Sequence, residues 1–151
     1  MPPRARSLGR ARSAARRLAM QALYQWQIGR EEAGELVTQF TERPEMDAAD
    51  REYFIALVRG CVQEHAALEG LMAPCLDRPV EQLDPVERAI LLVGTFELRG
   101  RPDVPYRVVI NEAVELAKVF GAQKSHLYVN GVLDRLAGSL RTTERGRAGA
   151  R

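Results

Sequence analysis

The chain has 151 residues, with 22 Lys and Arg against 20 Asp and Glu, so its formal net charge is +2. It contains no apolar run near the ~20 residues that a membrane span needs, and no apolar stretch typical of a signal peptide follows the basic start. Two cysteines are too few for a disulfide scaffold. We therefore expect one compact cytoplasmic domain.

The small net charge hides an uneven distribution. The first 17 residues hold six Arg and no acid, and residues 141–151 hold four Arg against Glu144. Between these ends lie 12 basic and 19 acidic side chains, a charge of −7. Basic ends on an acidic body indicate a polyanionic partner. An Arg-rich start is also typical of an organellar transit peptide, but core residues begin by Leu18, inside such a presequence.

The apolar periodicity is helical throughout, and no segment alternates as a strand would. It predicts helices over 10–28, ending at Gly29, and over 31–40, followed by a long third helix with Asp47 or Asp50 as its N-cap. A proline-rich stretch from Pro74 to Pro85 then separates an N-terminal from a C-terminal group of helices.

The second group begins with the clearest helix start in the chain, with Asp84 as N-cap, Pro85 at the first helical position and Glu87 at the third. After a polar loop, the stripe of the next helix ends at Gly121, which we expect to be its C-cap. The last helix is expected to take Ser125 as its N-cap. Gly131, inside that helix, is expected to permit close helix packing.

Residues typical of catalysis are not arranged in any recognisable pattern. Cys61 and His65 lie four apart on one predicted helix, but no third and fourth metal ligand follow at a suitable spacing. Glycine-rich nucleotide-binding motifs are absent. The sequence therefore predicts no enzyme, no catalytic residue, no metal, no cofactor and no small-molecule substrate.

The N-terminal helix has a second face opposite its apolar stripe. At 100° per residue one arc holds Arg10, Ser13, Arg17, Met20, Gln21 and Tyr24, with Arg16 and Gln27 at its edge and Arg12 bordering the apolar face. Guanidinium groups bind phosphates, and unstacked bases pack on aromatic or guanidinium planes. This face is typical of an RNA-binding surface, although the same pattern suits an acidic protein partner or a homodimer.

Several segments resemble the transcription antitermination factor NusB family. They are A-M-Q-A-L-Y-Q-W-Q (19–27), V-E-R-A-I-L (86–91), D-V-P-Y-R-V-V-I-N-E-A-V-E-L-A-K (103–118), F-G (120–121) and S-H-L-Y-V-N-G-V-L-D (125–134). They occur in the family's order and spacing over about residues 10–140.

The resemblance implies an all-α fold of six or seven helices in two packed three-helix bundles, about 10–76 and 84–140, in one domain over 10–140. We expect a flexible basic arm over 1–9 and a disordered basic tail over 141–151. The implied function is binding of the single-stranded boxA element of ribosomal RNA leaders together with NusE, a small-subunit ribosomal protein, in the antitermination complex of RNA polymerase and other Nus factors.

The resemblance also implies site residues. The expected RNA-binding residues are Arg10, Arg12, Arg16, Arg17, Gln21, Tyr24 and Lys124. The expected partner-binding residues are Tyr24, Glu81 and Glu87. In relatives the N-terminal arginines follow one another more closely than they do here. Lys124 stands at a position that is often acidic in the family, and this additional cation should raise RNA affinity and weaken discrimination between RNA sequences. Two alternatives stay open: a helical protein–protein adaptor without its own RNA specificity, and the RNA-binding appendage of a methyltransferase.

Overall fold

The computed structural model describes residues 3–149, and the side chains of residues 7–146. All regular structure in this part of the chain is helical, which confirms the all-α prediction. It comprises eight α-helices and three short 3-10 helices, more than the six or seven expected. Two compact units meet in the sequence between Glu64 and His65, so the proline-rich stretch lies inside the second unit. The grouping into two three-helix bundles stays a prediction.

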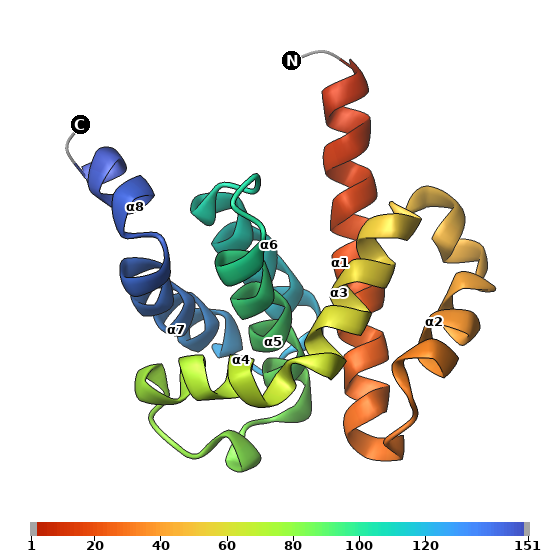
Figure 1. Ribbon diagram of the computed structural model, residues 1–151, viewed down its shortest axis with the longest axis horizontal. Coiled ribbons are helices and arrows are strands. Elements are labelled where there is room, and N and C mark those ends of the chain that lie inside the picture. Colours follow the sequence, from red (N-terminus) through yellow and green to blue (C-terminus); the bar gives the residue numbers. More distant parts are fainter. Residues whose placement is uncertain (1–2, 150–151) are drawn as a thin grey trace. The chain divides into compact units, whose positions relative to one another are not determined.

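The first unit consists of a long helix and the shorter helices packed on it. Helix α1 (Pro3–Gly29) contacts α2 (Ala33–Thr41), the 3-10 helix η1 (Pro44–Ala48) and α3 (Arg51–Gln63), and Figure 1 shows α3 running beside α1. Residues 3–9 belong to α1, so the expected flexible arm is helical there. Residues 1–2 of that arm lie outside the described residues.

The apolar stripe predicted for α1 is buried except at Ala11, which is half-buried. Its buried members are Ala15, Leu18, Ala19, Ala22 and Trp26. On the other helices Phe40 and Phe54 pack with their ring centroids 6.1 Å apart. Helix α1 ends at Gly29, as expected, and the Arg30 that follows has φ 56° with its guanidinium 5.2 Å from the Trp26 ring centroid. The cap of α3 is Asp50, whose carboxylate accepts the Tyr53 N–H at 3.0 Å.

The second unit contains the remaining helices. They are α4 (His65–Met72), η2 (Ala73–Cys75), η3 (Val80–Gln82), α5 (Pro85–Gly100), α6 (Tyr106–Phe120), α7 (Ser125–Leu140) and α8 (Thr142–Gly149). Helices α5, α6 and α7 contact one another, and α4 contacts α5 and α7 (Figure 1). Asp84 caps α5 as predicted: its Oδ1 accepts the N–H of Val86 at 2.8 Å and of Glu87 at 3.3 Å.

Helix α5 is the most deeply buried helix of this unit. Every residue from 89 to 95 is buried, so α5 is enclosed on all sides rather than along one stripe. A Cβ on Gly94 would lie 2.9 Å from Leu133 Cδ1, so Gly94 permits the close approach to α7. A Cβ on Gly131 would meet nothing within 4 Å, so the packing role expected for Gly131 is wrong.

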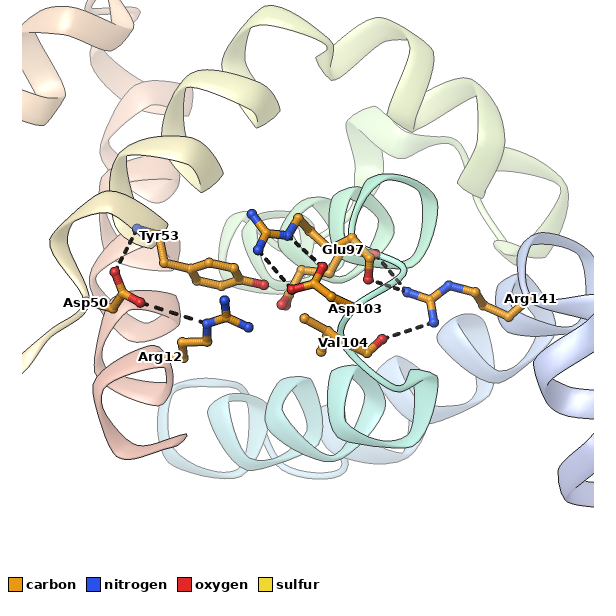
Figure 2. A network of polar contacts seen from close by, with 8 residues as sticks. Arg12, Asp50, Tyr53, Glu97, Asp103, Val104 and Arg141 are labelled. Atoms are coloured by element: carbon orange, nitrogen blue, oxygen red, sulfur yellow. Dashed lines mark hydrogen bonds and ion pairs between the residues drawn. The ribbon is translucent and has the colours of Figure 1, made fainter. Parts of the chain in front are cut away.

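The C-terminal segment is ordered where we expected a disordered tail. Residues 142–149 form α8, and residues 150–151 lie outside the described part. Arg141, only 8% exposed, donates to the backbone carbonyls of four residues at the end of α5 and in the loop after it. Figure 2 shows the contacts with Glu97 and Val104. The acceptors are Leu98 at 2.7 Å, Arg101 at 2.8 Å, Glu97 at 3.0 Å and Val104 at 3.0 Å. The C-cap residue of α5 is Arg101, whose N–H donates to the Glu97 carbonyl at 2.9 Å. Arg141 adds side-chain donors to the carbonyls at this helix end and so reinforces the cap.

Glu144 acts at the start of the next helix. Its Oε2 accepts the Tyr106 N–H, the first of α6, at 2.9 Å, and its Oε1 accepts from Arg141 Nη1 at 2.5 Å. Burial opposes ionisation of this carboxyl group, but the Tyr106 N–H and the Arg141 guanidinium outweigh it and lower the pKa of Glu144. Residues 141–144 therefore fix both ends of the α5–α6 loop.

Candidate nucleic-acid interface

One face of α1 presents the polar side chains expected of an RNA-binding surface. Arg10, Arg17 and Tyr24 are exposed and Gln21 is half-buried. Their separations of seven, four and three residues place them along one side of the helix. Met20, which the helical wheel also placed in this arc, is 2% exposed and belongs to the core.

Arg12 lies between this face and α3. Its Nε is 3.8 Å from Asp50 Oδ2, and its guanidinium carbon is 4.4 Å from the centroid of the Tyr53 ring (Figure 2). The Arg12 side chain keeps 31% of its surface exposed. Arg12 is thus held by the first unit while part of its side chain stays accessible.

Arg16 is buried, contrary to its expected place at the edge of the exposed arc. It is 3% exposed, and its guanidinium carbon lies 5.5 Å from the Tyr53 ring centroid. Two guanidinium groups therefore share one aromatic ring, a cation–π arrangement that stabilises the packing of α3 on α1. The sequence could not reveal this because Tyr53 is 37 residues further along the chain.

A hollow of about 610 Å³ opens beside Tyr24 in the first unit. Its lining includes Gln21, Tyr24, Ile28, Arg43 and Glu45. The Arg43 guanidinium carbon lies 3.8 Å from the centroid of the Phe40 ring. Sequence reasoning missed Ile28 and Arg43, since Arg43 follows the second helix and only the fold brings it to Tyr24.

Lys124, the basic candidate of the second unit, ends the loop between α6 and α7. It is exposed, occupies the N-cap position of α7 and has φ 69°, a left-handed backbone conformation. Ser125 is therefore the first residue of the helix and not its N-cap, so that prediction is wrong. Gly121 is the C-cap of α6, as predicted.

The two acidic candidates lie near the start of α5. Glu81 is exposed in η3, and Glu87, in the first turn of α5, is half-buried and accepts the Ser125 hydroxyl at 2.6 Å. The loop before Glu81 is fixed to α7, because Tyr128 Oη donates to Asp77 Oδ1 at 2.9 Å. The Arg78 guanidinium and this hydroxyl lower the pKa of Asp77 to about 2.

Over residues 3–149 no three His, Cys, Asp or Glu side chains are grouped so that they could hold a metal ion. None of the helices described there is both long enough and apolar enough to cross a membrane. The fold and this surface define an all-helical protein with an exposed arginine-bearing helix face.

Comparison with known proteins assigns the chain to a family. The model of the NusB family matches residues 13–138. The transcription antitermination protein NusB of Paraburkholderia phytofirmans is 52% identical over 134 residues, which cover 89% of this chain and 93% of that protein. The chain belongs to the NusB family.

Two solved structures share the fold. T. maritima NusB is 28% identical with a TM-score of 0.77, covering 84% of this chain and 90% of that one. A crystal structure of the antitermination factors NusB and NusE in complex with dsRNA is also 28% identical, with a TM-score of 0.75, covering 84% of this chain and 96% of that one.

Proposed function

We propose that this protein binds the single-stranded boxA element of ribosomal RNA leaders jointly with NusE, and so supports processive transcription by RNA polymerase with the other Nus factors. The observation that carries the proposal is the exposed face of α1, where Arg10, Arg17 and Tyr24 lie in line on a chain of the NusB family. The role is one of binding, without catalysis or a cofactor.

The residues of this face would make different kinds of contact with RNA, according to their chemistry. Arg10 and Arg17 are exposed cations that pair with phosphates, and the half-buried amide of Gln21 suits a base edge. Tyr24, 40% exposed, offers a ring for stacking on a base or for contact with NusE. Lys124 adds a phosphate contact from the second unit.

Arg12 and Arg16 would contribute differently. Arg12 can reach RNA with the exposed part of its side chain while Asp50 fixes its position. Arg16 is buried, so its contribution to RNA binding is to hold α1 against Tyr53 rather than to touch a phosphate.

The partner surface is acidic. Glu81 lies in η3 and Glu87 in the first turn of α5, and the body of the chain between its basic ends carries −7. Such a surface attracts a basic protein and repels misplaced RNA. The solved NusB relative in complex with NusE and RNA supports this pairing.

A fluorescence anisotropy titration tests the proposal. Labelled boxA-like RNA is titrated as a single strand and as a duplex, with and without NusE, at several salt concentrations. About four phosphate contacts predict a log–log slope of about −3 on the single strand, and Arg17→Ala should reduce its magnitude by about 0.7. Arg51→Ala, which removes an exposed cation of α3, is the control.

These titrations distinguish the proposed function from its alternatives. Equal affinity for single strand and duplex would contradict the single-strand assignment, which matters because the solved relative holds dsRNA. NusE binding without RNA binding at any salt concentration would favour the protein–protein adaptor.

A further inference from the structure

The Ser125 hydroxyl joins the proposed RNA-contacting loop to the proposed partner-contacting carboxylate. We propose that Ser125 is a positioning residue, and that its hydrogen bond to Glu87 couples NusE binding to RNA binding. This inference rests on the proposed function, because Lys124 and Glu87 are the two contact residues that it links.

The loop over residues 121–124 has little conformational freedom. A Cβ on Gly121 would lie 2.7 Å from the Ala117 carbonyl oxygen and 2.8 Å from Ser125 Oγ, so a glycine is needed there. At the other end, Lys124 has φ 69°, which residues with side chains rarely adopt. A loop of this kind keeps its shape only when the surrounding structure holds it.

Ser125 supplies that restraint directly after Lys124. It is 4% exposed, and its Oγ donates to Glu87 Oε2 at 2.6 Å, a short charge-assisted hydrogen bond. Glu87 belongs to the first turn of α5, which Asp84 caps firmly. The Lys124 backbone is thus fixed relative to α5 through one side-chain contact.

The second carboxylate oxygen of Glu87, Oε1, is the atom that a partner protein can contact. Oε2 is taken by Ser125, and among the described residues the cation that interacts electrostatically with Glu87 is Arg78, which is itself hydrogen-bonded to Asp77. A Lys or Arg of a basic partner can pair with Oε1 and leave the Ser125 bond intact. The partner then restricts rotation of the carboxylate and, through Ser125, the motion of the loop.

Coupling of this kind acts in both directions. A partner that fixes the Glu87 carboxylate reduces the ordering that RNA must impose on Lys124, so RNA binds more tightly. By linkage, RNA raises the affinity for the partner by the same factor. The net contribution of one ordinary hydrogen bond predicts a factor of about three to ten.

Ser125→Ala tests the coupling. It leaves Glu87 charged but removes the bond, so RNA affinity should fall about threefold and the enhancement by saturating NusE should fall to near one. RNA affinity is measured by anisotropy with and without NusE, and NusE affinity by calorimetry. The matched control is Ser139→Ala, because Ser139 is also a serine of α7 but its hydroxyl bonds only the Leu136 carbonyl. It should retain the full enhancement.

A second variant separates the two roles of Glu87. The amide oxygen of Glu87→Gln still accepts the Ser125 hydroxyl but carries no charge. It should therefore lose more NusE affinity and less RNA affinity than Ser125→Ala does. The reverse order would overturn the proposal. If Ser125→Ala fails to fold, Glu87→Gln is compared with the unmodified protein, and a loss of RNA affinity larger than its loss of NusE affinity would overturn the proposal.

Amide hydrogen exchange provides a readout that a purely stabilising bond would not give. NusE should slow exchange over residues 121–125 in the unmodified chain, and this slowing should disappear in Ser125→Ala. If the unmodified protein binds RNA and NusE without mutual enhancement, the coupling is refuted and the proposed function survives. If it binds neither, the proposed function itself fails.

Discussion

Arg141 donates from its Nε to the carbonyl oxygen of Leu98 at 2.7 Å, so a residue near the C-terminus closes the end of a helix 43 positions earlier. Arg141→Met keeps the aliphatic stem but removes the side-chain donor from four carbonyls, of which those of Glu97 and Arg101 keep a backbone donor. We expect the free energy of unfolding to fall by at least about 2 kcal/mol. Urea denaturation followed by circular dichroism measures it.

The control for that prediction is Arg145→Met, one helical turn further on. Arg145 pairs with the Asp134 carboxylate at 3.1 Å and donates to the Asp134 carbonyl, but both side chains are largely exposed, so its loss should cost less than about 1 kcal/mol. Equal effects of the two substitutions would show that Arg141 is no more than another surface cation.

The stability of the folded protein should depend on pH through ionisation of the Glu144 carboxyl group. Its pKa in the folded protein lies below the ordinary value of 4.5, so its contribution is complete above that pH and is lost as pH falls through the folded pKa. The difference in melting temperature between the protein and Glu144→Gln should be constant from about pH 7 to 5 and shrink below about pH 4.5. A difference that stayed constant down to pH 3 would disprove this assignment.

Adjacent arginines of α1 should behave differently. Arg16→Ala removes a buried guanidinium from Tyr53 and should lower the free energy of unfolding by about 1–3 kcal/mol. Arg17→Ala, at an exposed position, should change it by less than about 0.5 kcal/mol and yet weaken RNA binding. Chemical denaturation and RNA titration of both variants provide the comparison; equal stability losses would contradict the burial of Arg16.

The backbone of Lys124 can be tested separately from its charge. Lys124→Gly should raise the free energy of unfolding by about 1 kcal/mol, because glycine adopts the left-handed conformation without steric cost. Lys124→Ala loses the same charge but keeps that cost. The two variants should therefore lose RNA affinity together, with a salt slope smaller by about 0.7, and only the glycine variant should melt higher.

Sequence reasoning succeeded where the signal was local. The Asp84 cap depends on neighbouring residues, and so did the end of α1 at Gly29 and the apolar stripe through Leu18 and Trp26. Each of these features follows from the preferences of a few consecutive positions.

It failed where a distant residue decided the outcome. Arg16 lay at the edge of a helical wheel, and only Tyr53 on another helix determines that it is buried. Ser125 has the chemistry of an N-cap, but Glu87 takes its hydroxyl. Arg141 belonged to a segment of tail-like composition, and its carbonyl acceptors lie some 40 residues earlier.

The position of Arg141 and Glu144 also determines when the second unit can be completed during synthesis. The Leu98 carbonyl of α5 and the first N–H of α6 do not gain their side-chain partners until residues 141–144 have left the ribosome. The first unit has all of its helices by Gln63, so it is expected to fold while the rest of the chain is still being translated. A nascent chain that stops before residue 141 would therefore carry a finished N-terminal unit and an incomplete C-terminal one.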